Sequence, residues 1–216
     1  MPGSRTLRVE TAEWQQLQRA ARAGATDGVA GILADHLAAP VRALLVTTSG
    51  DRGVRSRLTM VGGQAVIAAQ RIASVEGEIR AEPGAQFTFA GPDELWPSLA
   101  RTLPDTELLR APASAAVGDD EPLAPGFEEA QKLLGREECN LRVQVEAWRG
   151  GDVPVIVWGR LWSVADDRLI DVRADDGDLR LVERPAGSVA KELRWALTGA
   201  ISATAGAAPT PEGAAG

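Results

Sequence analysis

The chain has 216 residues, of which 44% are hydrophobic and 25% charged, and a formal net charge of −7. This composition is ordinary for a soluble globular protein that buries its own core. Because the chain is acidic and has no basic run, we expect neither nucleic acid nor an anionic membrane surface as a partner. It also has no long apolar span for membrane insertion. A start without an apolar signal segment and a single cysteine, Cys139, predict a cytoplasmic protein.

The first half predicts two helices followed by an antiparallel sheet. A short strand over residues 7–10 leads into a helix over 11–23, where Trp14, Leu17 and Ala21 share one face. A second short helix ends before Pro40. The strands that follow are expected over residues 41–48, 54–61, 65–72, 76–81 and 86–90. Pro92 opens a helix with a leucine stripe that Pro104 ends.

The second half has a clearer pattern of strands and turns. A helix over 127–134 precedes the stretch 141–182, whose four apolar runs are separated by Gly- and Asp-rich turns. That pattern is typical of a four-stranded antiparallel meander, and a helix over 185–198 follows it. We expect one domain over residues 7–203, with halves of about 7–107 and 126–203 joined by a connector at 108–125. Residues 1–6 and 204–216 are expected to be disordered.

The two halves share the same order of elements. Residues 57–70 align with 160–173 without a gap. Four residue types recur at matched positions, namely Arg57 and Arg160, Leu58 and Leu161, Val61 and Val164, and Ile67 and Ile170. The sequence therefore predicts an α+β fold of two related halves, each an antiparallel β-meander with flanking helices, in a pseudo-twofold arrangement.

Residues for catalysis or metal binding are scarce. His36 is the one histidine and fits a surface or satisfied helix position better than a general base. Cys139 follows Glu137 and Glu138, which should raise its pKa. Turn chemistry and surface charge account for an acidic cluster, consisting of Asp166, Asp167, Asp171, Asp175, Asp176 and Asp178. We therefore predict no enzyme activity, no metal and no cofactor.

Tryptophans give the candidate protein-binding residues. Over 141–149, alternation places Leu141, Val143, Val145 and Ala147 on one face and Trp148 among charged residues on the other. The next strand is apolar on both faces, with Ile156, Trp158, Trp162 and Val164 predicted to share one of them. Such a strand is either a central core strand, the favoured interpretation, or the lining of a partner surface. The candidates for protein contact are Trp148, Arg149, Trp158, Arg160 and Trp162.

Three segments carry a family resemblance. They are RALLVTTSGDRGVRSRLTMVGGQAVIAAQ, FTFAGPDELWPSLARTLPD, and the second meander before RPAGSVAKELRWAL. Over about residues 7–200 the chain resembles the EspG family, cytosolic chaperones associated with ESX (type VII) secretion in actinobacteria. The resemblance implies a quasi-twofold fold and binding of PE/PPE-type heterodimeric substrates, whose apolar tip would be shielded before export. The alternative is a small hydrolase or ligand-binding enzyme with an apolar pocket between the halves, using Asp35 and His36.

Overall fold

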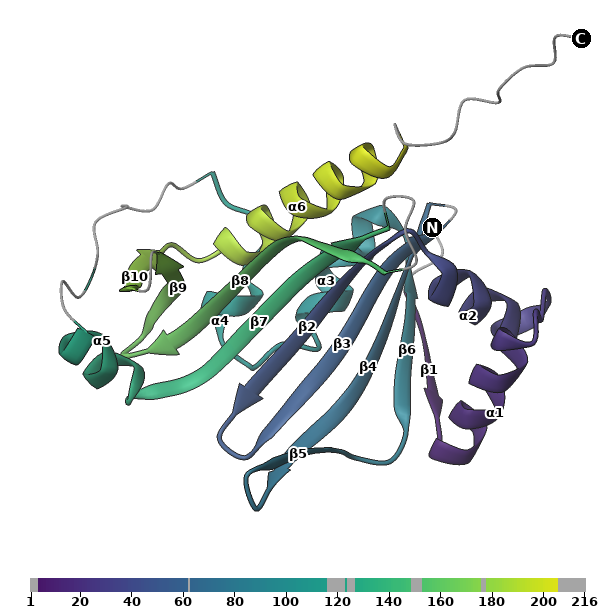
Figure 1. Cartoon of the computed structure of the whole chain (residues 1–216), viewed down its shortest axis with the longest axis horizontal. Coiled ribbons are helices and arrows are strands. Elements are labelled where there is room, and N and C mark those ends of the chain that lie inside the picture. The colour runs from purple at the N-terminus through teal and green to yellow at the C-terminus, as the bar shows by residue number, and fades with distance from the viewer. Residues whose placement is uncertain are drawn as a thin grey trace, which may run out of the picture.

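A single antiparallel sheet organises the structure, a computed structural model that describes residues 4–61, 63–115, 123, 127–148, 153–175 and 178–205. Within these residues the sheet has ten strands in the order β1-β6-β4-β3-β2-β7-β8-β9-β10, and β5 pairs with β4 (Figure 1). The strands are β1 (Arg5–Val9), β2 (Val41–Ser49), β3 (Arg52–Val61), β4 (Gln64–Val75), β5 (Glu78–Ala81), β6 (Ala85–Ala90), β7 (Glu137–Ala147), β8 (Val155–Ala165), β9 (Arg168–Asp175) and β10 (Asp178–Arg184).

Helices pack on both faces of the sheet. The helical segments are α1 (Thr11–Arg22), α2 (Gly28–Ala38), the 3-10 turn η1 (Pro92–Glu94), α3 (Leu95–Ala100), α4 (Glu107–Arg110), α5 (Phe127–Leu134) and α6 (Ser188–Ala205). Residues of α3, α4 and α6 join the main core with Ala43, Leu58 and Val145; we call this side of the sheet the α6 face. The opposite face packs against α1 and α2 at one end and against α5 at the other.

The pseudo-twofold arrangement of two related halves is confirmed. The meander β2-β3-β4-β6 and the meander β7-β8-β9-β10 meet where β2 pairs with β7, from Val41 opposite Ala147 to Thr48 opposite Asn140. In each half the helix before the meander, α2 or α5, packs on the opposite face. The helices after it, α3 and α4 or α6, pack on the α6 face. A twofold axis through the β2–β7 pair accounts for this arrangement.

The gapless alignment of the halves was wrong by one residue. The turn of the β3–β4 hairpin lies between Val61 and Gln64, and that of the β8–β9 hairpin between Ala165 and Arg168. Leu58 therefore corresponds to Trp162 rather than to Leu161. Both Leu58 and Trp162 are fully buried on the α6 face. Side chains alternate between the faces of a strand, so a shift of one residue exchanges the two faces.

The predicted elements are confirmed with shifted ends. The helix expected over 185–198 begins at Ser188 and continues to Ala205, and α4 occupies the start of the expected connector. Connector residues 116–122 and 124–126 lie outside the described residues, as do residues 1–3 and 206–216 of the two ends expected to be disordered. In the described part of the chain, none of the helices has the length and apolar character needed to cross a bilayer.

The burial of Trp162 predicts a large effect on stability. Truncating this fully buried ring in Trp162→Ala should lower the free energy of unfolding by about 3–5 kcal/mol. Trp195 is 70% exposed on α6, so Trp195→Ala should stay within about 0.5 kcal/mol of the wild type. Urea unfolding followed by far-UV circular dichroism measures both, and equal destabilisation by the two substitutions would contradict the packing described here.

Candidate functional site

The beginning of β8 exposes apolar side chains. Val153 is 74% exposed, Val155 52% and Ile156 54%; we call these three residues the apolar tip. They lie at and just before the start of β8, at the end of the sheet toward which α6 runs (Figure 1). Val155 pairs with Ala147 and Ile156 with Glu146, so their side chains point to opposite faces and the start of β8 is exposed and apolar on both sides. Exposed aliphatic side chains of this kind are found where soluble proteins bind partners.

A β-bulge changes which side chains share a face in β8. Val145 pairs with Trp158 and Glu146 with Ile156, so the register shifts at Val157. Val145 and Glu146 are neighbours and point to opposite faces. The expectation that Ile156 lies on the face of Trp158 was therefore wrong, because the extra residue reverses the alternation. As a result, Ile156 points away from the core that Trp158 joins.

The five predicted contact residues lie in different environments. Trp148 is half-buried, and the guanidinium of Arg42 lies 4.5 Å from the centre of its ring. Trp158 is also half-buried, with its ring 5.8 Å from that of Trp162. Trp162 is fully buried, so the core interpretation holds for it and no partner reaches its ring. Arg149 lies outside the described residues.

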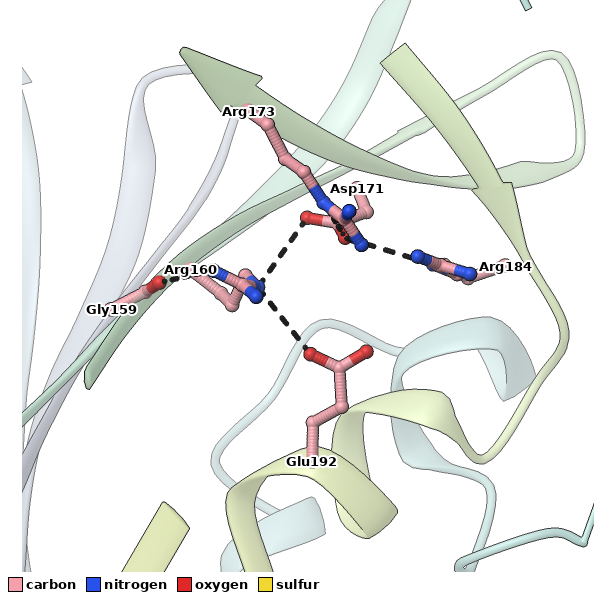
Figure 2. Close-up of polar contacts among 6 residues, drawn as sticks. All are labelled: Gly159, Arg160, Asp171, Arg173, Arg184 and Glu192. Carbon is pink, nitrogen blue, oxygen red and sulfur yellow. Dashed lines mark hydrogen bonds and ion pairs between the residues drawn. The ribbon is translucent and has the colours of Figure 1, made fainter. Parts of the chain in front are cut away.

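Arg160 belongs to a cluster of charged side chains between the sheet and α6 (Figure 2). The Nε and Nη2 atoms of Arg173 donate to Asp171 Oδ2 at 2.8 and 2.6 Å, and Arg184 Nε lies 3.6 Å from the same oxygen. Arg160 Nε lies 3.9 Å from Asp171 Oδ1 and 3.5 Å from Glu192 Oε2. The cluster thus links β8, β9 and β10 to α6.

Asp171 is the centre of this cluster and is fully buried. The interpretation of this residue as part of an acidic surface was wrong. Its side chain lies on the α6 face, next to that of its cross-strand partner Trp162. Burial, followed by the charge of Asp171, raises the pKa of Glu192. A buried carboxylate is stable only when cations neutralise it, and the three arginines of β8, β9 and β10 do so here. By contrast, Asp166 and Asp167 form the predicted turn, with φ of 51° and 57°.

His36 lies in the interior and not in a cleft. It is 3% exposed, and its Nδ1 is hydrogen-bonded to Thr59 Oγ1. Burial lowers its pKa to about 4, assisted by the positive charges of Arg57 and Arg42. A neutral, solvent-excluded imidazole has no water or substrate to deprotonate. Asp35 precedes it on α2 and is exposed.

Cys139 and the potential metal ligands are the remaining candidate groups for catalysis. Burial raises the pKa of Cys139 to about 11, with Glu138 and Glu137 adding to the effect. The thiolate that a nucleophile requires is therefore disfavoured. Among the residues that the structure describes, no three His, Cys, Asp or Glu side chains gather as metal ligands.

Comparison with known proteins identifies the fold. No protein-family model matches the chain, and no curated protein matches it either. Among solved structures, the chain is similar to EspG5, the type VII secretion system chaperone of Mycobacterium tuberculosis, in its complex with the PE25–PPE41 dimer. The match covers 97% of this chain and 99% of that chain, with a TM-score of 0.52 and 12% sequence identity. The chain has an EspG-like fold.

The EspG-like fold brings together side chains that sequence reasoning did not select. Asp171, Arg173, Arg184 and Glu192 come from three elements, and no local pattern links them. One signal was present: Asp171 stands between Ile170 and Val172 in a strand, and not in a turn as Asp166 and Asp167 do. A carboxylate inside an apolar strand indicates burial with a partner.

The buried Asp171 carboxylate should be necessary for stability. Asp171→Asn leaves the guanidinium groups of Arg173 and Arg184 facing a neutral amide, so the free energy of unfolding should fall by about 3–5 kcal/mol. Asp167→Asn is the matched control, since its exposed turn position at positive φ accepts asparagine and should change stability by less than about 0.5 kcal/mol. Urea unfolding at neutral pH compares them; a loss below 1 kcal/mol for Asp171→Asn would contradict the central role of this carboxylate.

The lowered pKa of His36 predicts a pH dependence of stability. The unfolded chain takes up a proton near pH 6.5 and the folded chain only near pH 4. The contribution of the neutral, buried imidazole to the free energy of unfolding is therefore complete above pH 6.5. It is lost as the pH falls toward 4, which lowers the free energy of unfolding by about 3 kcal/mol. Between pH 7 and 4 the unfolding free energy of wild type should fall by that much more than that of His36→Gln. Parallel pH profiles for the two proteins would refute a buried neutral imidazole.

Proposed function

We propose that this chain is a cytosolic protein-binding chaperone or adaptor for type VII (ESX) secretion substrates of the PE/PPE type. The observation that carries the proposal is the EspG-like fold over 97% of the chain, shared with a chaperone whose structure was solved with a PE25–PPE41 dimer bound. Fold alone does not fix function, so the proposal also needs a surface suited to a protein partner.

The apolar tip supplies such a surface. Val153, Val155 and Ile156 are close in sequence and exposed, and half-buried Trp148 directly follows the end of β7. We infer that these residues, with Arg149, Trp158 and Arg160 around them, contact the apolar end of the substrate. Large apolar and aromatic side chains bordered by arginine are the residue types that contribute most to binding at protein interfaces.

The alternative of a hydrolase receives no comparable support. It required Asp35 and His36 in a pocket between the halves, whereas His36 is buried with a pKa lowered to about 4. The halves are joined by the continuous β2–β7 ladder. We therefore propose a binding function without catalysis.

Co-expression with PE–PPE pairs tests the proposal. The tagged wild-type chain should retain a pair in a pull-down, and Ile156→Asp should reduce the retained amount at least tenfold, because a buried unpaired carboxylate opposes an apolar interface. Ile79→Asp is the matched control: Ile79 is 59% exposed on β5, away from the apolar tip, and its substitution should leave capture unchanged.

Two results would overturn the proposal. One is the absence of capture by wild type across a broad panel of pairs, and the other is an equal loss with Ile156→Asp and Ile79→Asp. Trp148→Ala in the same assay shows whether the end of β7 belongs to the contact surface, and a reduction of capture is expected.

A further inference from the structure

The second meander contains a fork that the first meander lacks. The β3–β4 ladder holds ten residue pairs, from Arg52 opposite Ala73 to Val61 opposite Gln64. The corresponding β8–β9 ladder holds five and stops at Leu161 opposite Val172. Beyond that pair, β8 continues to Val155 beside β7, and β9 continues to Asp175 beside β10. We call the gap between β8 residues 155–160 and β9 residues 173–175 the fork.

Two strand edges face each other across the fork. Within the described residues, β8 over 155–160 has a ladder partner only in β7, and β9 over 173–175 only in β10. Each edge therefore presents backbone N–H and C=O groups with no ladder partner on the fork side. Such edges are the template to which an additional extended segment pairs.

The groove in the fork is lined by cationic side chains. It has a volume of about 610 Å³, and among its lining residues are Arg142, Arg160, Arg173 and Arg180. No acidic residue belongs to the described lining, although the whole chain carries a net charge of −7. Arg160 and Arg173 also contact the carboxylates of Asp171 and Glu192 outside the lining. The excess of the four lining arginines over these two carboxylates favours a ligand with carboxylates.

The lining also has a two-sided pattern. Arg160 and Arg173 lie on the α6 face, as their contacts with Asp171 require, and Arg180 lies beside Arg173 as its cross-strand partner. Leu161 and Val172 pair with each other and point to the opposite face. An extended segment places alternate side chains on alternate faces. Alternating acidic and apolar residues would therefore meet Arg160, Arg173 and Arg180 on one side. On the other side they would meet Leu161 and Val172, with Arg142 as the cross-strand partner of Leu161.

Comparison of the halves shows that the charge is specific to the fork. In the corrected register, Arg160 corresponds to Ser56 and Asp171 to Ile67. Both Ser56 and Ile67 are uncharged and almost fully buried, and they lie in the half whose ladder is complete. The first meander thus forms its complete ladder without these charges. Arg160 Nε lies 3.9 and 3.5 Å from the carboxylates of Asp171 and Glu192, and its Nη1 donates to the Gly159 carbonyl at 3.2 Å.

From these observations we propose that the fork binds an extended acidic segment of a partner protein as an added strand. The segment's backbone pairs with the open edge of β8, and its carboxylates contact the arginines of the groove. The fork shares Val155, Ile156 and Arg160 with the surface proposed around the apolar tip, but it binds through the backbone edge of β8 and the groove arginines. The proposal does not depend on the identity of a secretion substrate.

Synthetic peptides test this proposal on the wild-type protein. The probe is a fluorescein-labelled nine-residue peptide of alternating Glu and Val, with binding followed by anisotropy at low salt. Two control peptides separate the contributions: alternating Lys and Val reverses the charge, and an N-methylated Glu–Val peptide keeps the charge but removes the N–H donors of one edge. The Glu–Val peptide should bind, and both controls should bind about tenfold more weakly or not at all.

A matched pair of variants locates the site. Arg180→Gln should weaken binding of the Glu–Val peptide at least about tenfold, the lower end of the range for a hydrogen bond to a charged group. Arg55→Gln, an exposed arginine of β3 outside the groove, should leave it unchanged. Absence of binding by the Glu–Val peptide, or equal affinity of its N-methylated form, would overturn the proposal, and neither outcome depends on the variants folding. Because no PE–PPE pair is used, failure here is distinguishable from failure of the chaperone proposal.

Discussion

The pairing of β2 with β7 is the contact on which the architecture depends. It joins strands about a hundred residues apart in sequence and places the apolar residues of both meanders on one continuous surface. Ala43 and Leu45 of β2 and Val143 and Val145 of β7 are all nearly inaccessible there. Helix α6 covers this junction, packing against β7 and β2. Burial of a common apolar surface under one helix explains why two meanders form one core instead of two.

The twofold relation determines where the halves are free to differ. Both must supply a strand to the central pair and a helix to each face, and both do. The outer strands do not form the central pair and are less constrained by it. In the second half this freedom appears as a buried charged cluster around Asp171 and as strands that separate beyond Leu161. Burying Asp171 is costly, and the arginines of three strands offset that cost.

Fold and function stand on different evidence in this protein. The overall path of the chain matches a secretion chaperone at 12% identity, a level at which the core packing persists while surfaces are rewritten. The binding surfaces that we propose are therefore features of this chain and not of the fold, namely the apolar tip and the arginine-lined fork. Both belong to β8, the strand whose bulge at Val157 turns Ile156 away from the core.

The sequence by itself determined the elements. Strands followed from two-residue alternation between glycine or aspartate turns, and helices from apolar spacing with proline at their boundaries, because these signals act between near neighbours. Trp148 and Arg160 could be selected as candidates in the same way, from their position in a strand. The tertiary structure alone decided the register of the repeat, the bulge, the length of the β8–β9 ladder and the burial of Trp162 and Asp171. Each depends on which residue lies across a strand or beneath a helix, as when Glu192 of α6 meets Arg160 of β8. A partner distant in sequence leaves no periodic trace in either segment.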